Sequence, residues 1–184
     1  MKIQLLPPII NAIQKGILQG YSEAVDKDLF LVHLMKRETN YILRNASEFV
    51  VRGVWVPASI VAGAFRGFKK LQVDPDSMTH SILSGAVQGS LAVEITEEVA
   101  IQGSVAQFVY ESDNPSYCAY NAISGVLDGL KSSQKQHGDD IKVAVLAYYE
   151  AADSIDTKTA LKVEKVLVKK FKESRSIIKS YRKL

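Results

Sequence analysis

The sequence predicts an all-α protein, a compact bundle of about eight helices. Apolar residues recur every three or four positions along most of the 184 residues, which is the spacing of one face of an α-helix. Alternating apolar and polar runs joined by two-residue turns, the pattern of β-hairpins, do not occur in the sequence. Four copies of a small-xxx-Gly-xxx-Gly pattern also indicate helices, because this spacing puts the small residues on one side of a helix.

Prolines and capping residues predict where the helices begin. Pro57 is expected in the first turn of a helix, and Pro75 and Pro115 each follow an Asp or Asn that can cap a helix start. Asp156 or Thr157 is expected to cap the last helix. Short connections favour antiparallel neighbours. We expect helices at 7–25, 27–54, 57–71, 75–95, 97–111, 115–134, 139–153 and 157–182.

Composition and length favour one helical domain over residues 1–184. The chain is 47% hydrophobic and 23% charged, the balance of an ordinary folded domain, so wholesale disorder is not expected. Its charge-free runs, such as 77–93, are too short or too polar to span a membrane. Cys118 is the one cysteine and cannot form an internal disulfide, which favours a cytoplasmic protein.

The repeated glycines are the most informative feature of the sequence. Glycine inside a helix costs about 1 kcal/mol relative to alanine, so eight such positions need a compensating interaction. The physical candidate is a close approach of two helix backbones. Packing inside the bundle is the favoured use of these faces, ahead of a self-association surface and of insertion into a membrane. The expected helix-packing residues are Gly16, Gly20, Gly63, Gly67, Gly85, Gly89, Gly125 and Gly129.

The order of these patterns suggests an internal duplication. Residues 48–53 and 98–103 resemble each other, since each segment begins with Glu and ends with Gly, and each lies between two glycine pairs. As a hypothesis, residues 1–73 and 74–135 are pseudo-repeats, and residues 139–184 add a C-terminal helical hairpin. The spacings differ between the two halves.

The expected last helix is strongly basic. From residue 158 onward there are ten Lys or Arg against Glu164 and Glu173, while the rest of the chain is acidic. An apolar stripe at three- and four-residue spacing runs along the same segment: Val163, Leu167, Phe171, Ser174, Ile178 and Tyr181. The simplest interpretation is a solvated basic face on a helix docked by its stripe. The candidate docking residues are Lys165, Lys169, Lys172, Arg175, Lys179 and Arg182.

No catalytic, metal or cofactor site is predicted. The three histidines lie far apart in sequence and lack the spacing of metal ligands. Adjacent acid pairs such as Glu97-Glu98 and Asp139-Asp140 lie where helix starts favour acidic residues. Cys118 is expected to be a buried small residue, because no sequence feature places a base beside it. The glycines do not follow a strand, so they do not form a phosphate-binding loop. An enzyme is therefore not expected.

The favoured function is a non-catalytic structural or assembly protein that engages itself or a protein partner through helix faces. The alternative is a peripheral module that binds an anionic membrane or a polyanion through the basic C-terminal helix. Nucleic acid is the less favoured polyanion, because no binding motif accompanies the basic residues. A carrier of an apolar ligand is a third hypothesis.

Overall fold

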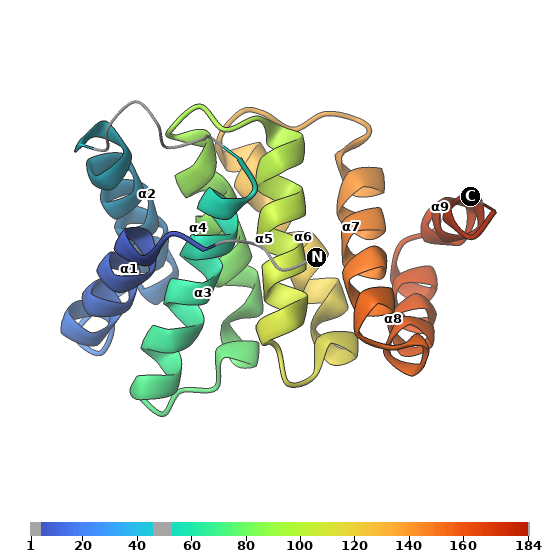
Figure 1. Ribbon diagram of the computed structural model, residues 1–184, viewed down its shortest axis with the longest axis horizontal. Helices are drawn as coiled ribbons and strands as arrows, with labels where there is room; N and C mark the ends of the chain where they lie inside the picture. Colours follow the sequence, from blue (N-terminus) through green and yellow to red (C-terminus); the bar gives the residue numbers. More distant parts are fainter. Residues whose placement is uncertain (1–4, 46–52, 184) are drawn as a thin grey trace.

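Helices form all the regular secondary structure in residues 5–45 and 53–183, the parts of the chain that the computed structural model describes. The all-α prediction is therefore confirmed (Figure 1). In chain order the helices are α1 (Pro7–Gly20), α2 (Lys27–Asn45), α3 (Trp55–Lys70), the 3₁₀ helix η1 (Pro75–Met78), α4 (Thr79–Leu91), α5 (Glu97–Glu111), α6 (Pro115–Ser132), α7 (Asp140–Ile155), α8 (Thr157–Lys170) and α9 (Ser174–Tyr181).

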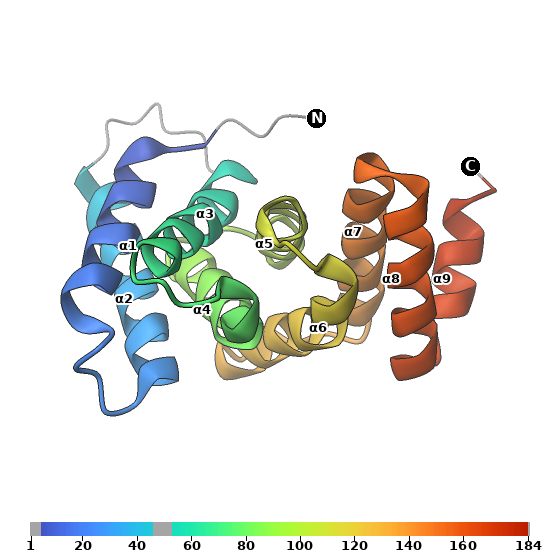
Figure 2. The same cartoon turned by 90° about the horizontal axis from the view of Figure 1, so that it is seen from below.

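Alternate helices pack on one another and build a stack of two rows. Helices α1, α3, α5 and α7 follow one another in one row, and α2, α4, α6 and α8 in the other. Helix α9 packs on both α7 and α8. Both views show an elongated arrangement, with α1 and α2 at one end and α8 and α9 at the other (Figures 1 and 2). The two ends of the stack therefore carry different segments of the chain.

Helices α3 and α4 lie at the centre of the stack. Residues 56–65 of α3 and 81–90 of α4 are all buried. Helix α3 packs between α1 and α5, helix α4 packs between α2 and α6, and the two also contact each other. Small and apolar residues dominate both helices because neighbours surround them. One hydrophobic core runs from Ile9 in α1 to Ile178 in α9.

Several predicted helix starts are confirmed by their caps. The Asp74 carboxylate accepts a hydrogen bond from the Asp76 backbone N–H at 3.0 Å. The Asp156 carboxylate accepts one from the Thr159 backbone N–H at 2.8 Å, so Asp156 caps α8. Pro115 occupies the first turn of α6, as predicted. These local signals act within three residues, which is why the sequence was sufficient to find them.

Three predicted helices differ from the observed ones by more than two residues at an end. The helix predicted at 7–25 ends at Gly20, and the chain turns there so that the Phe30 ring lies against Gly20. The helix predicted at 75–95 is divided into η1 and α4, and α4 ends at Leu91, three residues before Glu94 adopts a left-handed backbone conformation. For the helix predicted at 27–54, the described helix is Lys27–Asn45, residues 46–52 lie outside the described residues, and residues 53–54 are not helical.

The single helix predicted at 157–182 is two helices, α8 and α9. Phe171 has an extended backbone conformation (φ −125°, ψ 111°), and the chain turns before Ser174. A straight helix over this span would be about 39 Å long and would carry its far end away from the body. The break lets Phe171 stack on Tyr120 of α6, with ring centroids 5.7 Å apart. It also lets Ile178 reach the core, where it is completely buried.

The repeated glycines lie where helices of the chain meet. In α3, a Cβ atom on Gly63 would lie 2.9 Å from the Ile10 carbonyl oxygen of α1, and one on Gly67 would lie 2.9 Å from Ile17. In α6, Gly125 and Gly129 face the backbone of α4 at His80 and Ser84. Gly85 and Gly89 of α4 face Met35 of α2, and Gly16 and Gly20 of α1 face Leu34 and Phe30 of α2. The glycine faces are thus occupied within the chain.

The two proposed pseudo-repeats share one contact and differ in another. In each, the third helix packs its glycine pair on the first helix, which is α3 on α1 in 1–73 and α6 on α4 in 74–135. The glycines of α1 and those of α4 both face α2. For α1 this is the next helix of the same half, whereas for α4 it is a helix of the other half. The duplication stays a prediction, which a superposition of the two halves would test.

A common C-terminal cap follows three of the glycine pairs. Gln72, Glu94 and Gln134 have positive φ angles of 58°, 63° and 55°, and each lies five residues after the second glycine of its pair. In each cap the backbone N–H of the next residue donates a hydrogen bond to a carbonyl near the end of the helix, as Val73 does to Phe68 at 3.0 Å. A side chain in this left-handed conformation is strained.

We predict that alanine at Gly63 or Gly125 lowers the free energy of unfolding by about 1–2 kcal/mol, although alanine favours the helix. The added methyl group would meet backbone atoms of the neighbouring helix, which cannot move aside alone. Chemical denaturation measures the effect. The control is Gly138→Ala, whose Cβ would meet nothing within 4 Å. Equal stability of all three variants and the wild type would contradict the close-approach explanation.

We also predict that glycine at Gln72 or Gln134 raises the free energy of unfolding by about 0.5–1 kcal/mol, because glycine adopts a positive φ without strain. The matched control is Gln102→Gly in the middle of α5, where glycine should destabilise by about 1 kcal/mol. Thermal unfolding of the three variants measures the expected gain of stability at Gln72 and Gln134 and the expected loss at Gln102. A loss of stability at Gln72 and Gln134 would show that the caps do not store strain.

Candidate docking surface

Helices α8 and α9 form one end of the stack (Figure 2). The side of α8 formed by Ala160, Val163 and Leu167 is buried against the body. Ser174 and Ile178 are the buried residues of α9. Every residue of the predicted apolar stripe is thus turned partly or fully inward. The cations of this segment are left on the outside.

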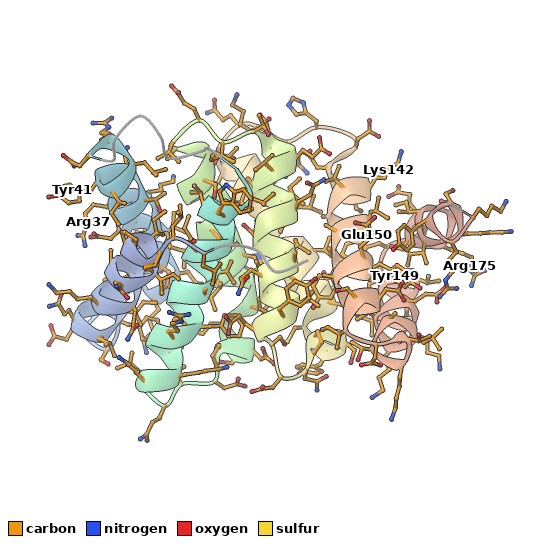
Figure 3. The ribbon with its side chains drawn as sticks, in the orientation of Figure 1. Arg37, Tyr41, Lys142, Tyr149, Glu150 and Arg175 are labelled. Carbon is orange, nitrogen blue, oxygen red and sulfur yellow. The ribbon has the colours of Figure 1, made fainter. Side chains whose placement is uncertain are left out.

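Three of the predicted docking cations line one hollow. Lys165 and Lys169 of α8 and Arg175 of α9 surround a depression of about 470 Å³, together with Glu164 and Val168. Arg175 projects from the outer side of α9 at the end of the stack (Figure 3). The break at Phe171 brings these side chains together, because it folds α9 back beside α8. Sequence spacing along an unbroken helix could not predict this arrangement.

Two further cations extend this exposed group. Lys172 lies in the connection between α8 and α9, and Lys179 lies on the exposed side of α9. Among the described residues, none of the ion pairs involves a cation of this group. We call the five residues the basic surface: Lys165, Lys169, Lys172, Arg175 and Lys179.

Arg182, the sixth predicted docking residue, has partners inside the molecule. Its guanidinium donates hydrogen bonds to the Tyr149 hydroxyl of α7 at 2.7 and 3.0 Å and to the Glu164 carboxylate of α8 at 2.6 and 3.3 Å. The Tyr149 and Tyr181 rings meet edge to face, with centroids 5.8 Å apart. Arg182 therefore joins the end of α9 to α7 and α8. No local pattern in the sequence indicates this role, because the partners of Arg182 lie 18 and 33 residues away.

The inward direction of the apolar stripe limits what the basic surface can bind. A peripheral membrane helix buries its apolar face among lipid chains. Here that face packs on the protein, and Leu161, 45% exposed, is the one large apolar side chain of α8 that remains clearly outside. The exposed side is therefore suited to attraction between charges, which weakens as ionic strength rises.

The described side chains with reactive or titratable groups lie in different parts of the molecule. Cys118 is 1% exposed, as predicted for a buried small residue, and burial raises the pKa of its thiol. The completely buried Tyr148 donates a hydrogen bond to the Pro115 carbonyl at 2.6 Å, and burial raises the pKa of its phenol well above the usual value. His80 and Asp128 form an exposed pair at 2.9 Å. Among the described residues, no group of three or more His, Cys, Asp or Glu could hold a metal ion.

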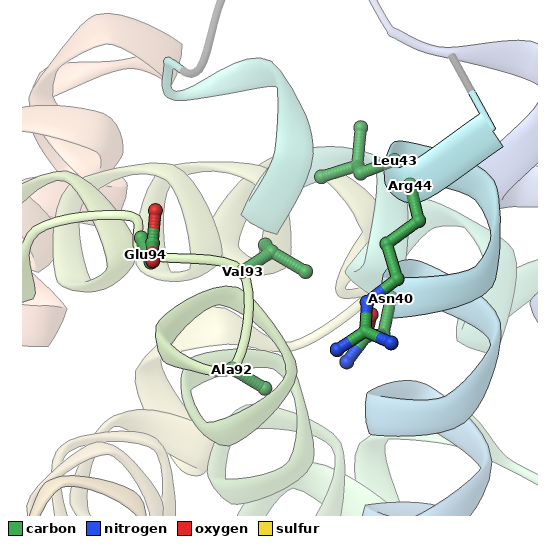
Figure 4. Close-up of a pocket in the computed structure, with 6 residues that line it drawn as sticks. All are labelled: Asn40, Leu43, Arg44, Ala92, Val93 and Glu94. Carbon is green, nitrogen blue, oxygen red and sulfur yellow. The ribbon is translucent and has the colours of Figure 1, made fainter.

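A second small hollow lies at the C-terminal ends of α2 and α4 (Figure 4). It has a volume of about 170 Å³ and is lined by Asn40, Leu43, Arg44, Ala92, Val93 and Glu94. We assign it no role. In the same described ranges, no helix has the length and apolar character needed to cross a membrane.

Comparisons with protein-family models, with curated proteins and with solved structures found no match to this chain. The function is accordingly argued from the basic surface and its surroundings.

We predict that Arg182→Ala loosens α9 without unfolding the protein. The Arg182–Glu164 pair is partly exposed, so its loss should cost no more than about 1 kcal/mol of global stability. Amide hydrogens of α9 should exchange faster, because fewer contacts hold that helix. Hydrogen exchange with mass spectrometry measures the change, with Lys183→Ala as the control. Identical exchange of α9 in both variants would contradict the assigned role.

Proposed function

We propose that this protein is a non-catalytic helical scaffold that binds an acidic segment of a protein partner through its basic surface. The observation that carries the proposal is the convergence of Lys165, Lys169 and Arg175 on one hollow, without an ion pair to any described residue. A carboxylate-bearing segment would meet several cations at once there. Such complementarity favours fast and selective association.

The stability of the fold does not require this arrangement. Lys165 and Lys169 are four residues apart on α8 and repel each other, at a cost of about 0.2–0.5 kcal/mol. Lys172 and Arg175 add positive charge nearby without a described ion pair. The apolar side of α8 and α9 already fixes both helices on the body. An acidic partner would offset the repulsion.

The stacked architecture also supports a scaffold. Alternate helices contact their neighbours along the stack, as in helical-repeat proteins, which use extended surfaces to bind other proteins. This is an analogy at the level of fold, and the site itself has to carry the function. Because the glycine faces are occupied inside the chain, a partner would bind the outer surfaces.

A second copy of the chain is one possible acidic partner. Residues 1–157 carry 13 Lys or Arg against 18 Asp or Glu, so they are negative as a group. Size exclusion with light scattering at low and high salt tests self-association. A dimer that dissociates at high salt would identify the partner as another copy, and a monomer at all salt concentrations would point to a different protein.

The predicted effect of charge reversal tests the proposal. The variant Lys165→Glu/Lys169→Glu/Arg175→Glu should lose the proteins that the wild-type chain captures from its native cell lysate at low salt. The loss is expected because carboxylates would then face carboxylates. The matched control, Lys15→Glu/Arg66→Glu/Lys131→Glu, reverses the same three charges at exposed positions on α1, α3 and α6 and should keep them.

Two outcomes would count against the proposal. If the control variant loses the same proteins as the charge-reversed variant, net charge matters and the basic surface does not. If the wild-type chain binds vesicles with anionic lipids, the charge-reversed variant does not, and no protein is captured, the alternative of a peripheral membrane module replaces the proposal.

A further inference from the structure

Helix α7 presents an exposed ridge between α5 and α9. Lys142, Leu146 and Glu150 lie four residues apart, so they share one side of the helix. Lys142 and Glu150 follow one another along the axis of α7 (Figure 3). The same three residues line two separate hollows, one on each side of α7. We call these three residues the α7 ridge.

The hollow between the α7 ridge and α9 is mainly apolar. Leu146 forms one wall, and Ile177 and Tyr181 of α9 form the other, with two serines of α9 between them. Its volume is about 550 Å³, within the range of about 300–1,000 Å³ found for binding pockets. All three large side chains are half-buried, so apolar surface remains in contact with water. A partner side chain could cover that surface.

The hollow on the other side of the ridge is smaller and acidic. It measures about 190 Å³ and is lined by Val143 and Ala147 of α7, with Glu98 and Gln102 of α5 opposite and Asp139 at the start of α7. Because the ridge is common to both hollows, they form one surface across α5, α7 and α9.

Carboxylates outnumber cations on this surface. Glu98, Asp139 and Glu150 line it against one cation, Lys142. Among the described residues, none of the three carboxylates takes part in an ion pair, and the Glu98 carboxylate accepts one hydrogen bond, from the Gln102 amide at 3.0 Å. Partial burial raises the pKa of the Glu150 carboxyl, because burial disfavours its charged form. A bound cation would favour the charged form.

We propose that the α7 ridge and its two hollows bind a short amphipathic helix of a partner protein that carries apolar and basic side chains. Apolar side chains would fill the hollow beside Ile177 and Tyr181, and Lys or Arg would meet Glu98, Asp139 and Glu150. Laying the apolar side of a helix into a groove is a common mode of peptide recognition. This inference is independent of the proposed function, since the basic surface has the opposite charge.

The length of the ridge sets the length of the bound helix. Asp139 and Glu150 are eleven residues apart, which is about 16 Å along a helix, or three turns. A bound helix of about three turns would therefore place basic residues near both ends. Between them, an apolar residue would meet Leu146, and an acidic or amide side chain would suit Lys142. This pattern distinguishes the site from one for a purely apolar ligand, which would leave the carboxylates without a counterion.

The test uses the full chain and two labelled synthetic peptides in fluorescence anisotropy. Both peptides have leucines at three- and four-residue spacing, and one carries lysines where the other carries glutamates. The lysine peptide should bind at least about tenfold more tightly than the glutamate peptide, because only its charges complement the carboxylates. Hydrogen exchange of the wild-type complex should show protection at 98–102, 139–150 and 174–181.

Three variants locate the site. Glu98→Lys/Glu150→Lys and Leu146→Ser should each weaken the lysine peptide by at least about tenfold, through lost charge attraction and lost apolar contact respectively. The control Glu23→Lys/Asp113→Lys makes the same change in net charge at exposed positions that line neither hollow, and it should bind within about twofold of the wild type. Circular dichroism confirms that each variant is folded.

Equal binding of the two peptides would overturn the proposal, because charge would then play no part in recognition. An equal loss in the control variant would overturn it as well, since general attraction to an acidic protein would explain the binding. Protection of the wild-type complex at residues outside 98–102, 139–150 and 174–181 would place the peptide elsewhere. A preference for vesicles of neutral lipid over either peptide would assign the apolar hollow to lipid.

Discussion

The close approach of helix backbones at glycine positions is the contact on which the stack depends. Gly63 of α3 lies against the backbone of α1 at Ile10, and Gly125 of α6 lies against the backbone of α4 at His80. A side chain at either position would push apart two helices that are next-but-one along the sequence. Because helices two places apart in sequence pack on one another along each row, a displacement at one crossing is expected to affect its neighbours in the row. The helix propensity given up by glycine is offset by contacts between helices.

Close packing at the centre also explains how polar groups are accommodated there. The Ser90 hydroxyl donates to the Ala86 carbonyl at 2.7 Å, and the Gln88 amide donates to Ser84 at 3.1 Å, so these groups find partners within α4. Ser59 of α3 instead accepts the backbone N–H of Leu6 at 2.7 Å, which joins the segment before α1 to α3. Buried polar groups that are satisfied in this way do not need water. Small residues fill the centre of the stack, so a partner would have to bind its outer surfaces.

The C-terminal end combines two outer surfaces of opposite charge. The break at Phe171 folds α9 back onto α7 and α8, and Arg182 holds it there through Tyr149 and Glu164. One side of this end carries the basic surface, and α7 carries the ridge lined by carboxylates. Both depend on the position of α9, because it contributes Arg175 to one and Ile177 and Tyr181 to the other. A change that loosens α9 is therefore expected to affect both surfaces together.

The sequence by itself determined the features that depend on neighbouring residues. Helical periodicity, the caps at Asp74 and Asp156 and the excess of cations after residue 157 are all local properties, so the fold class and the basic segment could be predicted. The tertiary structure decided what requires distant residues to meet. It brought the Tyr120 ring against Phe171 at the break between α8 and α9, and it placed Arg182 beside Tyr149. The α7 ridge and its two hollows likewise exist only because packing of the core brings α5, α7 and α9 together. No spacing within one helix encodes that contact.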